Sequence, residues 1–95
     1  MVINFEQVHN YYERLVFTAV ASQASMHPNY SADNLADVAC VMLNRLPARY
    51  VRHDVDLMFY LTEKERYHIE ESLTEALAYA FEFVGQRMVK QDNVN

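Results

Sequence analysis

Apolar residues recur at spacings of three and four along much of this chain, which is the period of an α-helix that buries one face. The first such stretch predicts a helix from about Phe5 to Ser25, and Asn4 with Gln7 resembles a capping box at its start. The proline and the small polar residues of QASMHPNYS then interrupt the pattern. One amphipathic helix is therefore expected in the N-terminal part of the chain.

A second helix follows with the same period. It is predicted to begin at Ser31 or Asp33, since both residue types cap helices well. It is predicted to end close to Arg45 or Leu46, because Pro47 disfavours helical geometry in the residue before it.

A long third helix is predicted from about Glu63 to Val89, with Thr62 and Glu65 as a second capping box. Phe81 and Phe83 widen its apolar stripe beyond what one small partner helix needs, which favours a dimer. The last residues, QDNVN, are expected to fray.

Between the second and third helices the period changes to two. Apolar residues alternate with polar ones from Val51 to Phe59, which predicts a short half-buried strand or extended segment after Pro47. Its backbone needs a hydrogen-bonding partner, and the same segment of a second subunit is one candidate. The expected fold is mainly α: a small single domain over residues 1–95, with three principal helices and one short extended or β segment.

Composition excludes several classes of function. The formal net charge of −5 repels nucleic acid and anionic membranes, so neither DNA nor RNA is expected as a partner. The one cysteine, Cys40, lies between Ala39 and Val41 and is expected to be a buried thiol without a disulfide in its own chain. The sequence has no signal-peptide pattern and no apolar run of about 18 residues, which favours a cytoplasmic protein without a membrane segment.

One segment departs from this acidic composition: LNRLPARYVRHDVD, residues 43–56. It brings Arg45, Arg49 and Arg52 close together, and its first carboxylate is Asp54. At physiological salt, screening confines the field of distant carboxylates to about 8 Å, so this local charge can attract a small anion.

The stretch ADVACVMLNRLPARYVRHDVDLMFYL resembles the late-competence ComFB family, in which a helix ends in an LNRLPP-type turn followed by an RYV-like extended segment. The matching residues are Leu43, Asn44, Arg45, Leu46, Pro47, Arg49, Tyr50 and Val51. NYYERLV, residues 10–16, is also similar, so the resemblance spans most of the chain. The turn motif is its specific part.

The resemblance implies two properties. Competence-operon members from Gram-positive bacteria form homodimers and bind zinc through a cysteine cluster just before the second helix. HPNYSADNLAD stands at that place here, so no metal site is expected. Other members, notably cyanobacterial ones, are receptors for cyclic dinucleotides that act on type IV pili and motility. The resemblance therefore implies a homodimeric receptor, with cyclic di-GMP as the expected ligand.

The residue chemistry suits a ligand that presents phosphates and flat bases. Arginine binds phosphate or the guanine edge through its planar fork, and its face stacks on a base. A tyrosine ring stacks on a base with a gain of about 1–3 kcal/mol, and a carboxylate accepts from guanine N–H groups. The expected ligand-binding residues are Arg49, Tyr50, Arg52, Arg45, His53, Asp54 and Asn44.

The same residues have simpler interpretations. Arg52 can pair with Asp54, and Arg45 can complement the carboxyl end of the second helix. On a strand, Tyr50 and Arg52 share one face and Arg49 lies on the other, so the arginines need not converge.

No glycine-rich phosphate loop, nucleophile elbow or zinc-binding helix is present, so the expected function is non-catalytic. A metal site built from His53, Asp54 and distant histidines has no recognised ligand spacing. Tyr11 and Tyr12 either line a ligand pocket or pack in the core or in a dimer interface. The rival hypothesis is a homodimeric adaptor whose RYV segment pairs with another protein and holds no small ligand.

Overall fold

The computed structural model describes residues 1–92 of the chain. Its elements follow in the order η1 (Phe5–Gln7), β1 (His9–Asn10), α1 (Tyr12–Gln23), η2 (Ala24–Met26), α2 (Ala32–Arg45), β2 (Tyr50–Val51), α3 (Asp54–Tyr60) and α4 (Glu63–Asp92). The two η elements are 3-10 turns, and β1 and β2 form an antiparallel ribbon. The prediction of a small, mainly α domain is confirmed.

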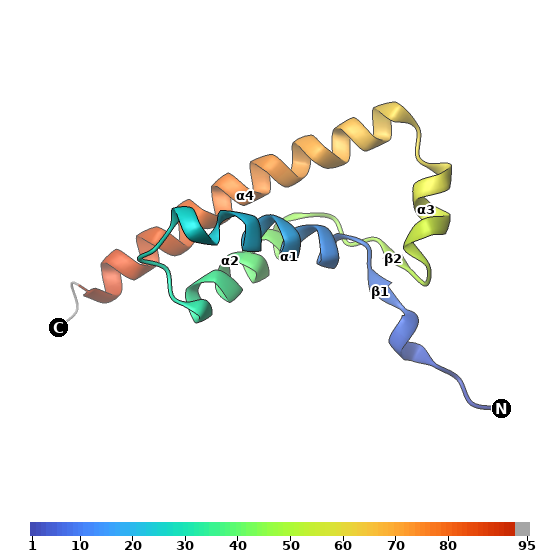
Figure 1. Cartoon of the computed structure of the whole chain (residues 1–95), viewed down its shortest axis with the longest axis horizontal. Helices are drawn as coiled ribbons and strands as arrows, with labels where there is room; N and C mark the ends of the chain where they lie inside the picture. Colours follow the sequence, from blue (N-terminus) through green and yellow to red (C-terminus); the bar gives the residue numbers. More distant parts are fainter. Residues whose placement is uncertain (93–95) are drawn as a thin grey trace.

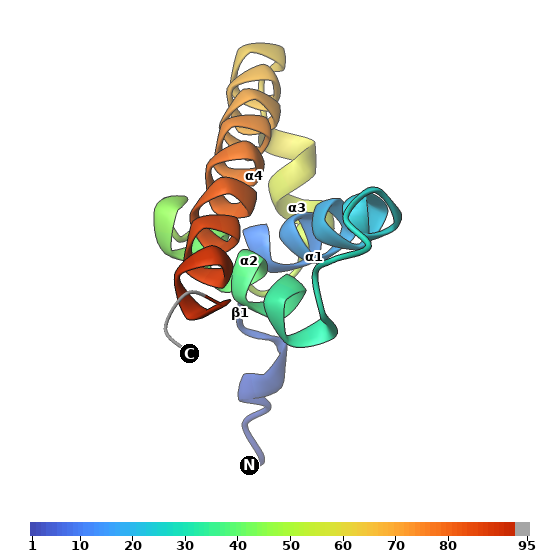
Figure 2. The ribbon, with the colours of Figure 1, turned by 90° about the vertical axis from the view of Figure 1, so that its left-hand side faces the viewer.

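The core lies where α1, α2 and α4 meet. The long helix α4 crosses the other two, while α3 stands near its N-terminal end (Figures 1 and 2). Val16, Val38 and Met42 of α1 and α2 are fully buried. Ala76 and Ala80 are small and buried, which lets the backbone of α4 approach its neighbours closely.

Capping residues fix the starts of two helices. Ser31 Oγ accepts from the backbone N–H of Asn34 at 3.0 Å, and the Asn34 side chain accepts in return from the Ser31 N–H at 2.9 Å. Thr62 Oγ1 accepts from the Glu65 N–H at 3.1 Å and donates to its carboxylate at 3.2 Å. The predicted starts of α2 and α4 are therefore confirmed.

The predicted helix from Phe5 to Ser25 is wrong at both ends, since α1 begins at Tyr12 and gives way to η2 after Gln23. Asn4 caps only the short turn η1. The next residues leave the helical path because β1 pairs with β2. The β2 segment thus finds a partner within its own subunit, and a second copy is not needed to satisfy its backbone.

The predicted extended segment after Pro47 is confirmed only over β2. The following residues form α3, whose first turn carries Asp54 and Asp56, and these carboxylates complement the positive end of the helix dipole. The alternation of apolar residues led to a wrong prediction of an extended segment here, because Val55 and Phe59 are four positions apart and also fit a helix.

Cys40 is exposed, which contradicts the expected buried thiol. Val38, Ala39 and Met42 take the inward positions of α2, so Cys40 lies on the outer side of that helix.

Helix α4 runs on to Asp92, past its predicted end at Val89. The predicted fraying of QDNVN falls partly on residues 93–95, which lie outside the described part of the chain. None of the helices in residues 1–92 combines the length and the apolar character that crossing a bilayer requires.

Candidate functional site

The turn of the basic segment is fixed to the start of α1 by backbone hydrogen bonds. The buried side chain of Asn10 accepts from the N–H of Arg49 at 3.0 Å and from the N–H of Tyr12 at 3.2 Å. The Arg49 carbonyl accepts from the Tyr11 N–H at 2.7 Å. The position of the Arg49 backbone is therefore set by the ribbon and by α1 together.

A cavity of about 410 Å³ lies between this turn, α1 and the first turns of α4. We call it the Arg49 cavity; the side chains that matter for its chemistry are Tyr12, Arg49, Lys64, Glu65, His68 and Ile69. Its volume falls within the range of roughly 300–1,000 Å³ that is usual for small-molecule sites.

Basic side chains from two parts of the chain meet at the Arg49 cavity. Arg49 comes from the turn, whereas Lys64 and His68 lie four residues apart on one face of α4. Within residues 1–91, neither Arg49 nor Lys64 forms an ion pair with a carboxylate. Glu65 also lines the cavity and keeps its negative charge while it accepts from the Thr62 hydroxyl. The two cationic side chains outweigh this one carboxylate, so the cavity favours an anion.

Tyr12 contributes a neutral hydroxyl to this cavity. Its side chain is nearly buried, and burial raises the pKa of the phenol, an effect that the nearby Arg49 guanidinium partly reverses. The hydroxyl therefore stays protonated at neutral pH and can donate to a phosphate oxygen. Tyr12 thus serves both of the roles that the sequence left open, as a core residue and as a cavity wall.

All of the other predicted ligand residues lie outside the Arg49 cavity. Tyr50 is 67% exposed on β2, and Arg52 and His53 are exposed between β2 and α3. The guanidinium of Arg45 lies 3.8 Å from the centroid of the Tyr79 ring on α4. These side chains therefore do not form one cluster within a single subunit.

Asp54 and Asn44 have partners of their own. The carboxylate of Asp54 pairs with His9 Nε2 at 2.6 Å. Its partner is therefore His9 and not Arg52, which the sequence had suggested. The side-chain amide of Asn44 donates to the Cys40 carbonyl at 2.9 Å, within its own helix.

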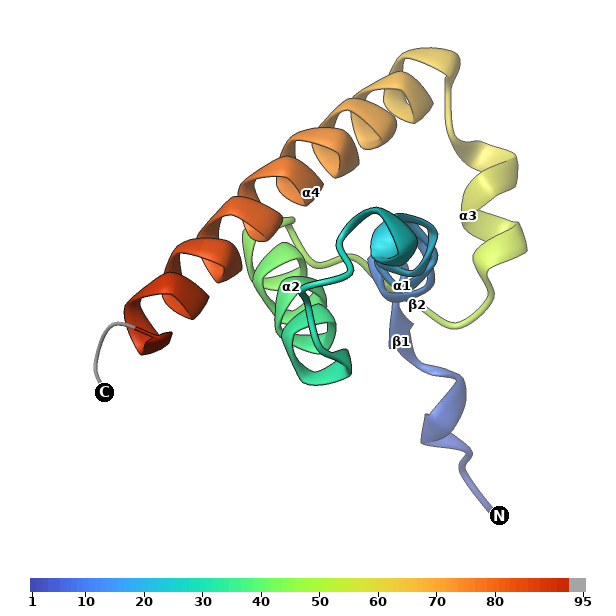
Figure 3. The same cartoon turned by 60° about the vertical axis from the view of Figure 1, so that its left-hand side comes forward.

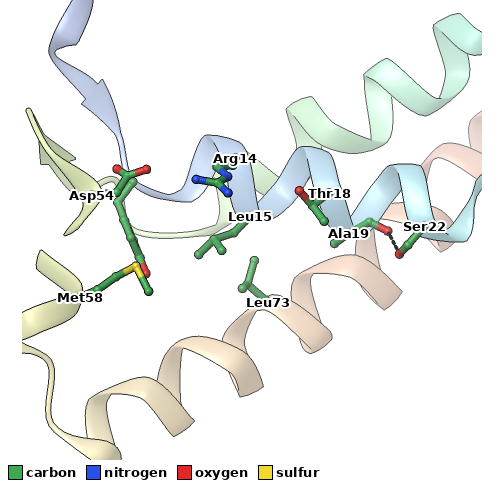
Figure 4. Close-up of a pocket in the computed structure, with 9 residues that line it drawn as sticks. Arg14, Leu15, Thr18, Ala19, Ser22, Asp54, Met58 and Leu73 are labelled. Carbon is green, nitrogen blue, oxygen red and sulfur yellow. Dashed lines mark hydrogen bonds between the residues drawn. The ribbon is translucent and has the colours of Figure 1, made fainter.

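A second cavity, of about 420 Å³, lies between α1, α3 and α4 (Figure 4). Leu15 and Leu73 face one another across it, and Met58 closes the end towards α3. Its charged groups, Arg14 and Asp54, have opposite signs. A phosphate ligand would thus meet less positive charge here than in the Arg49 cavity.

The sequence prediction did not include two residues that line the Arg49 cavity, Lys64 and His68. Their spacing directly after the Thr62 capping box was a usable signal that they share one helix face. Their meeting with Arg49 depends on how α4 packs against the turn, which no local pattern encodes. Within residues 1–92, no group of three or more His, Cys, Asp or Glu side chains is placed to hold a metal ion.

Comparison with known proteins adds one finding. A family model described as late competence development protein ComFB matches residues 9–88, a range that includes the turn and every residue named for the Arg49 cavity. Searches of curated proteins and of solved structures found no match.

Proposed function

This chain belongs to the ComFB family, and on that premise we propose that it is a non-catalytic cytoplasmic receptor for a cyclic dinucleotide, cyclic di-GMP. In this proposal it passes the signal to type IV pilus, motility or competence machinery. The observation that carries the proposal is the Arg49 cavity, a space of about 410 Å³ that is lined by the unpaired basic groups of Arg49 and Lys64.

The cavity supplies the contacts that one phosphate of such a ligand requires. Arg49 and Lys64 offer charged donors, and Tyr12 offers a neutral one. Tyr50 directly follows Arg49 in the chain, and its exposed ring is available for stacking on a base. Arg52 and His53 lie further along the same exposed stretch and are assigned to the outer part of the ligand.

A homodimer extends this arrangement. A cyclic dinucleotide has two-fold symmetry, and an isologous dimer presents identical groups about a two-fold axis. Two copies of the turn would then contact equivalent halves of one ligand. Ligand residues that lie apart within one subunit would then contact the same ligand molecule from two subunits. We therefore include the homodimer in the proposed function.

Calorimetric titration with cyclic di-GMP and cyclic di-AMP tests the proposal. We expect saturable binding at physiological salt, tighter for cyclic di-GMP. Arg49→Ala and Lys64→Ala should each weaken it about tenfold or more, because each removes a charge-assisted hydrogen bond. Arg14→Ala, which truncates an exposed arginine of the other cavity, is the matched control and should leave affinity unchanged.

The rival function is a homodimeric adaptor without a small ligand. It is favoured by the ribbon, in which β2 uses only one of its edges for pairing within residues 1–92. If calorimetry shows no binding heat for either nucleotide while circular dichroism shows that the protein is folded, the receptor hypothesis is rejected in favour of the adaptor.

A further inference from the structure

Two arginines and two aromatic rings form a continuous column on the outer face of α2 and α4. The Arg45 guanidinium lies 3.8 Å from the centroid of Tyr79. Tyr79 stacks on Phe83 with centroids 5.9 Å apart and planes inclined by 24°, and the Arg87 guanidinium lies 5.6 Å from the centroid of Phe83. We call these four residues the Arg45–Arg87 column. Figure 3 shows α2 and α4, the two helices that supply it.

The Arg45 guanidinium lies closely over an aromatic ring, whereas the Arg87 guanidinium lies at a longer distance from one. Within residues 1–91, neither Arg45 nor Arg87 forms an ion pair. Stacking on a ring restricts the side chain while its N–H donors remain available in the plane of the guanidinium. Both ends of the column thus present cationic donors on a protein whose formal net charge is −5.

A shallow, open cavity of about 310 Å³ lies between α2 and α4, and Arg45, Tyr79 and Phe83 of the column line it. Val41, Tyr79 and Phe83 contribute its apolar walls. The Asn44 amide at its edge donates to the Cys40 carbonyl, so it needs no partner from a ligand. The cavity has room for an apolar side chain from a docked segment.

The column differs in chemistry from the Arg49 cavity and shares no residue with it. Its rings already stack on each other and carry guanidinium groups, so the column lacks the isolated ring that a flat base needs. Surfaces rich in arginine, tyrosine and phenylalanine are typical of the centres of protein interfaces. These properties favour a polypeptide over a nucleotide as the occupant.

We propose that the Arg45–Arg87 column is a docking surface for an acidic segment of a partner protein. Carboxylates of that segment pair with Arg45 and Arg87, and an apolar side chain between them enters the adjoining cavity. Charge complementarity selects this occupant, since two unpaired guanidinium groups flank an apolar centre. The proposal does not depend on nucleotide binding.

Selection from a random peptide library displayed on phage tests this surface directly. The full-length protein is the target, and the Arg45→Ala/Arg87→Ala double variant is used to remove peptides that bind elsewhere. We expect the selected peptides to be rich in Asp and Glu around one or two large apolar residues. In fluorescence polarisation with labelled copies, the double variant should bind them at least about tenfold more weakly, because the two charged contacts that it loses together cost more than one tenfold step.

Three controls separate this surface from other sites. Arg14→Ala, which truncates an exposed arginine outside both the column and the Arg49 cavity, should leave peptide affinity unchanged. Phe83→Ala should reduce peptide affinity while circular dichroism confirms that the helices persist. The Arg45→Ala/Arg87→Ala variant should retain nucleotide binding if the receptor proposal holds, so failure of one proposal is distinguishable from failure of the other.

The proposal is overturned by any of three results. The library yields no peptides that distinguish wild type from the double variant, or the selected peptides are not acidic. The double variant changes the molecular mass in light scattering, which would make the column an interface between copies of this chain. The double variant loses cyclic dinucleotide binding, which would assign the column to the nucleotide site.

Discussion

Both ring nitrogens of His9 face hydrogen-bond acceptors. Nδ1 lies 2.6 Å from the Gln7 carbonyl, and Nε2 lies 2.6 Å from the Asp54 carboxylate. Only the imidazolium form donates from both nitrogens. The hydrogen bond to Gln7, followed by that to Asp54, raises the pKa of His9 above its usual 6.5, and the charge of Glu13 adds to the effect. In its protonated form, His9 links β1 to the first turn of α3 through hydrogen bonds from both nitrogens.

Stability should therefore depend on pH through His9. A group whose pKa is raised in the folded state contributes its full stabilisation below the unfolded pKa, and this is lost as the pH rises through the folded pKa. Urea unfolding of wild type and His9→Gln, followed from about pH 6 upwards, should show a difference that shrinks with rising pH. Both proteins contain the other histidines, so the contributions of these residues to the pH dependence cancel in the difference. A constant difference would show that the His9 contact is not ionic.

Gly85 leaves room for the hydroxyl group of Tyr30. Tyr30 donates to the Phe81 carbonyl at 2.8 Å, and a Cβ on Gly85 would lie 2.6 Å from that hydroxyl oxygen. The ring of Tyr30 also packs on His27 and Phe81, which limits its freedom to move aside.

The effect of Gly85→Ala should accordingly change with the residue at position 30. Alanine in a helix is favoured over glycine by about 1 kcal/mol. In wild type this gain is offset by displacement of the Tyr30 hydroxyl and loss of its hydrogen bond, worth about 1 kcal/mol. In a Tyr30→Phe background the nearest remaining ring atom is 3.7 Å away, so the same change should stabilise. Equal effects in the two backgrounds, by urea unfolding, would contradict this account.

At the scale of elements, the sequence predicted best where a local signal decides the outcome. Ser31 and Thr62 are caps whose side chains bond within their own helix, so α2 and α4 begin where expected. The start of α1 at Tyr12 could not be predicted in this way, because it depends on the pairing of β1 with a segment some forty residues later in the chain. The turn of the candidate site followed from Pro47, whereas its partners on α4 required the tertiary fold.

The ribbon itself should depend on Asn10. Its side-chain oxygen accepts from the backbone N–H groups of Tyr12 and Arg49, and the residue is only 6% exposed. Asn10→Ala leaves both donors without this acceptor and should lower the free energy of unfolding by about 2–4 kcal/mol. Asn10→Asp keeps an acceptor of the same shape and should cost less. Similar losses for the two variants in urea would show that the oxygen is not what holds the turn.

At the scale of the whole molecule, the chain is extended for its length. Its radius of gyration is 15.8 Å and its extents are 54 × 38 × 22 Å, whereas a compact domain of this size has a radius of gyration of about 12 Å. A thin shape leaves large apolar side chains uncovered, and on α3 these include Val55 at 75%, Phe59 at 81% and Tyr60 at 78% exposure. The apolar cavity of Figure 4 lies beside the same helix.

A second copy covering α3 would account for both the shape and the exposed apolar residues. Light scattering at micromolar concentration should then give twice the chain mass of 11.2 kDa. Phe59→Ser removes a large exposed side chain from the proposed interface and should shift the mass towards a monomer, because burying an aromatic side chain contributes about 1.5–3 kcal/mol per subunit. Val89→Ser is the matched control, since Val89 is 59% exposed at the opposite end of α4. A monomer mass for wild type would remove the dimer from the proposed receptor, and a dimer unaffected by Phe59→Ser would place the interface away from α3.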